Sequence, residues 1–378
     1  MNALIMPYGG PGWKEKQRIL EGIASRRGAP PFLYNDVLVI VPSSRLRRTY
    51  GRLFLDLVER KHGARAVVPP HIQTLHQLFQ RLYTRLGGAP LIDENSRLIL
   101  FEGIVKELIT GRPGFGSTPD ILAPSLSASL ADMVEELSSS GIGPAGLASA
   151  VAGAESADKP QVGLLIESYR AYERILSEKG LVDPAGMLAA LARGFDPAWL
   201  AEYAAIIVDG IHDATGLEAR VLGKIAACGN CMFLVDAPSA GHIRTAGERH
   251  PLRLTRDFLE RVGIAAGEAL SPAGSDDLFL ADALFSERSF AEAAQRAPAS
   301  FSRRIRLVSS VNTREEVSFI AGEVKRSLKS GTVPDSILVA FPSLDEYGPL
   351  VEELFIDFGI PYNRSLGRQL GTSPVTSF

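Results

Sequence analysis

Short apolar runs and segments with helical spacing alternate along the first third of the chain. The run Ala3–Pro7 is followed by a glycine-rich stretch, and Lys14–Arg26 then carries apolar side chains at helical intervals. A β-branched run, Val37–Val41, precedes a second helical pattern that ends near Val58, and a third strand is expected at residues 66–68, again before a helix. Strands that alternate with helices at this spacing predict an α/β fold with a parallel sheet and helices on both faces.

The middle of the chain has a different pattern. From Asp93 to about Leu200 only helical spacing is found, interrupted by stretches rich in glycine and proline. Strand-like runs return at Ala205–Val208 and Met232–Val235, with the helical segment Leu217–Ala227 between them. We therefore expect an all-helical insertion, after which the same sheet continues.

The last part of the chain predicts a second α/β unit. A polar stretch rich in alanine and serine, Ser286–Arg304, is typical of a linker, and Ile305–Ser309 and Ser336–Phe341 are expected to be strands, each followed by a helix. Two strands are too few for an independently stable sheet, so we expect the chain to be part of a longer protein.

These patterns define the expected domains. Residues 1–92 and 200–290 form one discontinuous α/β domain, residues 93–199 the helical insertion, and residues 303–378 the incomplete start of a second α/β domain. The division agrees with the length of 378 residues, which exceeds the ~100 to 200 residues of one typical domain.

Composition narrows the class of protein. Apolar residues make up 46% and charged residues 22%, as in folded globular proteins. No apolar run approaches the ~18 residues that cross a bilayer, so no membrane partner is expected. Two cysteines cannot form a disulfide framework and suit a reducing compartment, so we expect a cytoplasmic protein.

The net charge of −3 hides an uneven distribution. Lys14 to Arg65 contains 12 basic and 5 acidic residues, a local charge of +7, whereas Asp93 to Asp213 contains 8 basic and 18 acidic residues, a local charge of −10. The difference predicts one region that can face a polyanion and one that cannot. Solvated helix faces give the same pattern without a ligand, and this alternative stays open.

The glycine-rich stretch after the first strand stands where a phosphate-binding loop would. Such a loop feeds a helix N-terminus and ends in Gly-Lys-Ser/Thr, which supplies an ammonium for phosphate and a hydroxyl for magnesium. Here Gly10 and Gly12 precede Lys14, but Trp13 takes the place of the last glycine and Glu15 that of the hydroxyl. We interpret the segment as a degenerate loop that does not hydrolyse nucleotide, with weak or noncanonical nucleotide binding as the alternative.

Three further motifs have local structural interpretations. Gly141–Gly146 matches G-x-G-x-x-G but follows a helix instead of a strand, so a helix cap and turn is expected. Cys228 and Cys231 lack a second cysteine pair and predict a turn that enters a buried strand. Glu323-Val324-Lys325 is similar to the Glu-x-Lys of metal-dependent nucleases but lies within a predicted helix without a suitable upstream aspartate.

A series of weaker motifs, taken in order, carries a resemblance to a family. Val39–Arg48 is similar to motif Ia of UvrD-type superfamily 1 helicases, and Thr74–Leu78 to their Thr-Phe-His motif. Ile206–Asp213 resembles their Walker B segment, and Phe233–Ala240 resembles motif III. The resemblance extends to the second motor domain, whose opening is similar to residues 312–320 and 337–362.

The resemblance is strongest at positions that shape the fold and fails at catalytic ones. Gly210 stands in the place of the catalytic glutamate, and Ala240 stands where the family has a glutamine that senses the γ-phosphate. This combination resembles the N-terminal half of AddB-type proteins, which belong to bacterial ATP-dependent helicase-nucleases. It implies a P-loop-NTPase-like (RecA-like) sheet, a helical subdomain 1B, and the start of domain 2A.

The resemblance also implies functional residues. A degenerate nucleotide site would comprise Gly10, Gly12, Lys14, Asp209 and Asp236. Residues aligned with the positions that touch a DNA strand in motor relatives are Ser43, Ser44, Arg45, Thr74 and His76. Thr74 as a simple helix cap and the neighbouring arginines as solvated charges are the structural alternative.

The expected function is a non-motor, helicase-like scaffold of a helicase-nuclease complex in recombinational repair of DNA double-strand breaks. The expected partners are single-stranded DNA or DNA ends and an AddA-like motor subunit. No catalytic residue, metal or cofactor is expected in this chain; a PD-(D/E)XK-type exonuclease with its metal, and an iron-sulfur cluster, would lie in the C-terminal part of the full-length protein. The alternatives are a protein-protein docking scaffold without DNA binding and a weakly active superfamily 1 ATPase or helicase.

Overall fold

The computed structural model describes residues 2–7, 10–63, 66–110, 119–152, 160–269 and 306–363, with a few isolated positions between 270 and 305. The chain divides into two compact units, Met1–Arg296 and Ala297–Phe378. Most of the predicted linker Ser286–Arg304 lies outside the described residues.

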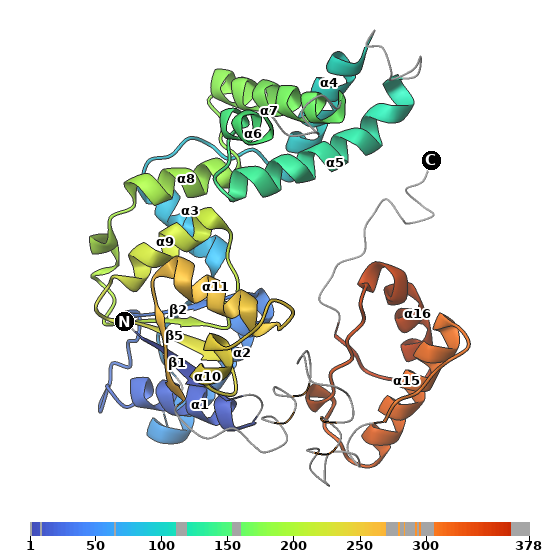
Figure 1. Cartoon of the computed structure of the whole chain (residues 1–378). Coiled ribbons are helices and arrows are strands. Elements are labelled where there is room, and N and C mark those ends of the chain that lie inside the picture. The colour runs from blue at the N-terminus through green and yellow to red at the C-terminus, as the bar shows by residue number, and fades with distance from the viewer. Residues whose placement is uncertain are drawn as a thin grey trace. The chain divides into compact units, whose positions relative to one another are not determined.

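The first unit is built on a parallel sheet of six strands (Figure 1). The strand order is β3-β2-β4-β5-β1-β6, and every pairing is parallel. The parallel α/β fold with helices on both faces is thus confirmed, and it is the layered architecture of P-loop proteins. In chain order the strands are β1 (Asn2–Met6), β2 (Val37–Val41), β3 (His71–Thr74), β4 (Ala205–Asp209), β5 (Cys231–Asp236) and β6 (Ala265–Ala269).

Two apolar cores cover the two faces of this sheet. Alternate side chains of each strand enter opposite cores, as the two-residue period of a strand requires: Val39 packs on one face and Leu38 and Ile40 on the other. One face is covered by α1 (Gly10–Ala24) and α2 (Ser44–His62). The other is covered by α3 (Leu75–Arg85), α8 (Pro184–Gly194), α9 (Gly216–Ala226), α10 (Ala240–Arg244) and α11 (Leu252–Val262).

A helical subdomain is inserted between α3 and β4. Its helices are α4 (Glu94–Ile109), α5 (Pro119–Ser139), α6 (Pro144–Val151) and α7 (Pro160–Lys179). They share a core of their own, in which the rings of Phe101 and Tyr172 lie 4.5 Å apart. Helix α8 and the short 3-10 helix η1 (Pro197–Leu200) fall within the predicted insertion, but their buried side chains join the core of the sheet.

The second unit contains the helices α15 (Thr313–Lys329) and α16 (Leu344–Asp357) and the 3-10 turn η2 (Pro334–Ser336). Residues 306–309 and 337–341, where strands were expected, pair with no other strand in the described part of the chain. Leu307 is 94% exposed and Leu338 81% exposed, so among the described residues these segments have no neighbouring strand with which to form a sheet.

None of the helices in the described ranges is both long enough and apolar enough to cross a membrane.

Candidate functional site

Two carboxylates meet where neighbouring strands of the sheet end. Asp209 is the last residue of β4 and Asp236 the last of β5, and Asp236 lies level with Met6 at the end of β1. Because parallel strands end at the same edge, these side chains and the start of α1 occupy one edge of the sheet. The structure thus brings together two of the residues that the sequence assigns to a degenerate nucleotide site.

The third member of this cluster is Lys16, on α1. Its Nζ atom lies 2.8 Å from Asp209 Oδ1 and 2.9 Å from Asp236 Oδ1, and it donates a 3.0 Å hydrogen bond to Asp236 Oδ2. Lys16 is only 7% exposed and Asp209 is fully buried. The contact with Asp209 Oδ1 is an ion pair that lacks hydrogen-bond alignment, since this oxygen has no hydrogen-bond partner among the described residues.

Two further side chains complete the cluster. Tyr50, from α2, donates a 2.5 Å hydrogen bond to Asp209 Oδ2. Burial and the neighbouring Asp209 raise the pKa of Tyr50 far above its ordinary 10.0, so the phenol stays a donor. His212 Nε2 lies 3.6 Å from Asp236 Oδ2 at the more open side of the cluster. We call Lys16, Asp209, Asp236, Tyr50 and His212 the strand-end cluster.

The cluster favours the ionised forms of Lys16 and Asp236. Burial alone would lower the pKa of Lys16, but the charges of Asp209 and Asp236 outweigh it and raise the pKa above 10.5. Burial alone would raise the pKa of Asp236, but contacts with His212 and Lys16 outweigh it and lower the pKa below 3.8. The lysine and this carboxylate therefore remain charged over the whole neutral range.

The sequence pattern singled out Lys14, whereas the structure brings Lys16 to the carboxylates. Lys14 is exposed on α1. Lys16 lies in line with Gly12 and Leu20 at intervals of four residues, on the face of α1 that packs against the sheet. A charge within an apolar helical stripe signals a buried pairing, and this signal was present in the sequence.

The connection between β1 and α1 is short. Strand β1 ends at Met6 and α1 begins at Gly10, which leaves residues 7–9 between them. The Walker pattern, by contrast, places four residues between its two glycines ahead of the lysine. Gly12 lies inside α1 and allows close contact, because a Cβ atom there would lie 1.9 Å from the carbonyl oxygen of Pro7.

The residues in the places of the magnesium ligands already have partners within the protein. The hydroxyl that would bind magnesium is replaced by Glu15, which is 8% exposed and paired with Arg18 at 2.5 Å. The two carboxylates that could hold the metal are already in contact with an ammonium, Lys16.

The residues expected to contact DNA lie at the same end of the sheet, where the neighbouring strands β2 and β3 lead into α2 and α3. Ser43 caps α2 and accepts from Leu46 N, and Thr74 caps α3 within a capping box closed by Gln77. Val41 and Thr74 are register partners in β2 and β3, so the two helix N-termini are adjacent. We call Ser43, Ser44, Arg45, Thr74 and His76 the two-helix edge.

The two-helix edge is held together and open to solvent. Arg47 donates a 3.3 Å hydrogen bond from Nη1 to Gln77 Oε1 and so ties α2 to the cap of α3. The side chains of Ser44, Arg45 and His76 are exposed, whereas the oxygens of Ser43 and Thr74 already accept backbone hydrogen bonds. The structural role expected for Thr74 as a helix cap is therefore present, and its role in DNA binding stays a prediction.

The remaining motifs have the local structures expected of them. Helix α5 ends at Ser139, Gly141 has φ of +84°, and Gly143 caps α6, so Gly141–Gly146 is a cap and turn. Cys228 and Cys231 close a turn into β5 through a 3.1 Å bond from Cys231 N to Cys228 O. Burial raises the pKa of both thiols, that of Cys231 to about 12, which disfavours reactive thiolates.

The charged side chains of the Glu323-Val324-Lys325 segment already have partners within the second unit. Glu323, within α15, pairs with Arg306 and Arg326, and the neighbouring Lys325 donates to the carbonyl of Phe358. No group of three or more His, Cys, Asp or Glu side chains in the described ranges is arranged to hold a metal ion.

The fold and the strand-end cluster define a parallel α/β protein of P-loop-like architecture in which a lysine lies between the two strand-end carboxylates. The chain is similar to the B-type subunit of an ATP-dependent helicase/deoxyribonuclease from Staphylococcus carnosus (strain TM300), with 22% identity over 221 residues. The match covers 55% of this chain and 18% of the relative's length. The sequence matches no protein-family model.

Proposed function

We propose that this chain is the helicase-like, non-motor part of an AddB-type subunit in a helicase-nuclease complex that repairs DNA breaks. In this role it holds single-stranded DNA at the two-helix edge without hydrolysing ATP. The name of the similar protein supports the helicase-nuclease context. The observation that carries the DNA-binding role is the adjacency of the two exposed helix N-termini at the ends of β2 and β3.

The chemistry of this edge suits a phosphate backbone. Each helix N-terminus contributes partial positive charge and free N–H groups, which attract anions. Arg45 and His76 are exposed beside these termini, and Ser44 adds a hydroxyl. Side chains of these types contact phosphate and sugar without reading the base sequence. The two-helix edge is therefore better suited to holding a DNA strand than to recognising its base sequence.

The proposed loss of ATP hydrolysis is inferred from positions where catalytic groups are replaced. Phosphoryl transfer is catalysed mainly by positioning and charge stabilisation, so each missing group lowers the rate. Gly210, with φ of +72°, offers no carboxylate to activate water, and Ala240, at the start of α10, offers no amide. Asp209, which is retained, is engaged by Lys16 and Tyr50.

Oligonucleotide binding tests the DNA-binding role. We expect Arg45→Ala and His76→Ala to weaken binding of a single-stranded oligonucleotide, measured by fluorescence anisotropy at several salt concentrations. Removal of one phosphate interaction should reduce the slope of log affinity against log salt by ~0.7. Arg60→Ala is the matched control, because it removes one exposed positive charge at the opposite end of α2 and should change the slope far less.

The position of the positive charge on α2 distinguishes binding at the two-helix edge from general electrostatic attraction. Equal effects of Arg45→Ala and Arg60→Ala would mean that the chain binds DNA only through its general positive charge. Unchanged affinity and salt slope in both Arg45→Ala and His76→Ala would remove the two-helix edge from the proposal.

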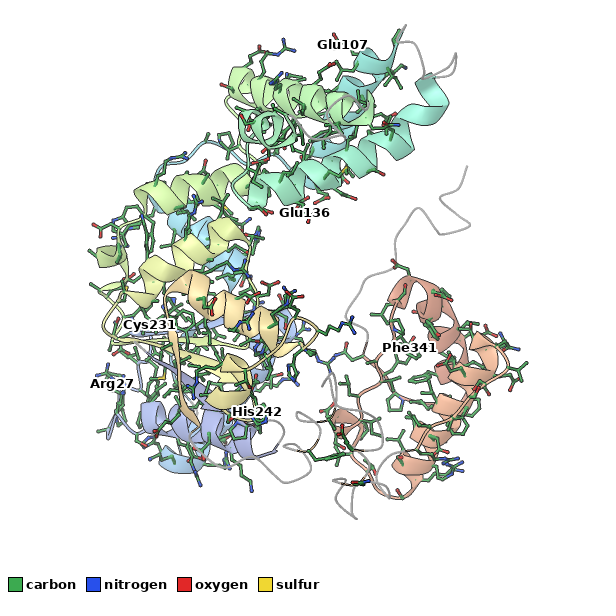
Figure 2. The ribbon with its side chains drawn as sticks, in the orientation of Figure 1. Arg27, Glu107, Glu136, Cys231, His242 and Phe341 are labelled. Atoms are coloured by element: carbon green, nitrogen blue, oxygen red, sulfur yellow. The ribbon has the colours of Figure 1, made fainter. Side chains whose placement is uncertain are left out.

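A docking scaffold is the second candidate, and the helical subdomain favours it. Figure 2 shows Glu107 on α4 and Glu136 on α5, and both side chains are exposed. Exposed Ile99 and Met133, 70% and 51% accessible, add apolar surface on the same two helices. An acidic surface with apolar positions suits a basic protein partner. Co-purification with an AddA-like motor subunit, together with no oligonucleotide binding by the chain, would favour this candidate.

A further inference from the structure

The strand-end cluster contains a cation of its own at a place where this fold family holds magnesium. The Lys16 ammonium lies within 3.0 Å of three carboxylate oxygens, one from Asp209 and two from Asp236. We propose that Lys16 is a built-in replacement for the divalent cation: its ammonium closes the carboxylate pair to magnesium, and removing it uncovers a divalent-cation site.

The ligand set explains why the uncovered site would take a divalent ion. Asp209 and Asp236 supply hard oxygen ligands from adjacent strands, and magnesium is commonly held by one or two carboxylates together with water. Tyr50 already donates to Asp209 Oδ2. Within the described part of the chain Asp209 Oδ1 accepts no hydrogen bond, and it faces Lys16. Without the ammonium, two buried or half-buried negative charges would face each other.

The packing of α1 explains why the ammonium excludes a metal. The helix is pressed against the end of β1, since Gly12 leaves no room for even a Cβ atom beside the Pro7 carbonyl. One turn beyond Lys16, Leu20 is 2% exposed in the core under the sheet. Lys16 cannot move away without leaving a buried carboxylate unpaired, which is strongly unfavourable. Magnesium would have to displace a cation that the fold itself supplies.

Manganese binding tests the replacement, with Mn²⁺ as the spectroscopic substitute for magnesium. We expect Lys16→Met in the full chain to bind one Mn²⁺ with a Kd of roughly 10⁻⁴ to 10⁻³ M, the range of weak carboxylate sites. Binding is measured by electron paramagnetic resonance as a decrease in the signal of free Mn²⁺. Wild type and Lys14→Met should show no such site. Lys14→Met is the matched control because it removes an exposed lysine two residues away on the same helix.

A second substitution assigns the metal to the cluster. In Lys16→Met combined with Asp236→Asn, the Mn²⁺ site should disappear because one of its two carboxylates is gone. Survival of the site in this double variant would overturn the proposal, as would failure of folded Lys16→Met to bind. If Lys16→Met does not fold, the melting temperature of the wild type is measured with and without millimolar Mg²⁺. A melting temperature that rises with Mg²⁺ would show that Lys16 does not exclude the metal, and would overturn the proposal.

This inference builds on the proposed loss of ATP chemistry and can fail separately from the DNA-binding role. Mn²⁺ binding reports only on the strand-end cluster, whereas oligonucleotide affinity reports on the two-helix edge. If Lys16→Met gains no metal site while Arg45→Ala still lowers DNA affinity, the replacement is wrong and the proposed function stands.

Discussion

One ammonium neutralises part of the charge of two carboxylates in the strand-end cluster, so the strength of the cluster depends on pH. The pKa of Asp236 in the folded protein is below 3.8. The ionised carboxylate therefore stabilises the fold at pH values above the pKa of the unfolded state, and this stabilisation is lost as the pH falls through the pKa of the folded state. The pKa of Lys16 in the folded protein is above 10.5. The ammonium therefore stabilises the fold fully below pH 10.5, and this stabilisation is lost only as the pH rises through the pKa of the folded state. The cluster should therefore stabilise the fold across the whole neutral range.

The difference in unfolding free energy between wild type and Lys16→Met measures this effect. With a chelator present to exclude metals, we expect a loss of about 3 kcal/mol between roughly pH 5 and pH 9, because an unpaired buried carboxylate remains. The loss should shrink in acid as Asp236 becomes protonated. Denaturant unfolding across this pH range tests it, with Lys14→Met expected to match wild type throughout. A difference that stays constant into strong acid would show that the ion pairs do not couple to folding.

Lys14 and Lys16 show what a motif can and cannot predict at a single residue. A motif places a residue by counting along the chain, and the count led to Lys14. The geometry depends instead on which face of α1 meets the sheet, and that face contains Lys16. Asp209 and Asp236 could be predicted because each directly follows a buried apolar run, which fixes it at a strand end.

At the scale of the element, two of the three glycines in α1, Gly12 and Gly22, have opposite surroundings. A Cβ atom on Gly12 would lie 1.9 Å from the Pro7 carbonyl oxygen, whereas one on Gly22 would meet nothing within 4 Å. Gly12 is therefore required for the docking of α1 at the end of β1, and Gly22 is an exposed interior glycine that only weakens the helix.

Alanine substitutions at these two positions should have opposite effects. We expect Gly12→Ala to destabilise the protein by about 1 to 3 kcal/mol, because backbone must shift to admit the methyl group. Gly22→Ala should stabilise it by about 0.5 to 1 kcal/mol through helix propensity. Thermal unfolding of both variants checks the pair, and equal effects would mean that α1 is not in close contact with Pro7.

Elements whose residues have strong propensities could be predicted from the sequence. The runs Val37–Val41 and Cys231–Asp236 are strands close to where the pattern placed them. Strand β6 (Ala265–Ala269) was missed because Ala-Ala-Gly-Glu-Ala has no β-branched residue and forms a strand only by pairing with β1. The third strand lies at His71–Thr74, after the expected residues 66–68, where Val68 forms only an isolated bridge with Leu33.

The opposite error occurs in the second unit. Residues 337–341 have strand-like composition, yet they form no ladder in the part of the chain that the structure describes. Propensity sets which residues tolerate an extended backbone, but a strand also needs a partner at hydrogen-bonding distance. Local pattern alone could not supply that information.

At the scale of the whole first unit, α2 joins the two candidate sites. Its N-terminus provides Ser43–Arg45 at the two-helix edge, and two turns later Tyr50 reaches Asp209 in the strand-end cluster. The loops after β2 and β4 are also close, since a Cβ atom on Gly210 would lie 3.5 Å from Pro42. In an active motor such a connection would couple nucleotide to DNA. Here it joins the proposed DNA-binding edge to a cluster whose negative charge Lys16 partly neutralises.

Such a molecule should bind DNA without consuming ATP. Since loss of a general acid-base group alone lowers rates by ~10² to 10⁴, we expect ATP turnover below about 0.01 per second, with or without single-stranded DNA. A coupled assay on the purified chain measures it, and Asp209→Asn sets the background from contaminating enzymes, since that variant should give the same trace. The opposite result would be a DNA-stimulated turnover near one per second that Asp209→Asn abolishes. That result would establish the weakly active ATPase, and Lys16 would then have to move away from the carboxylates during each catalytic cycle.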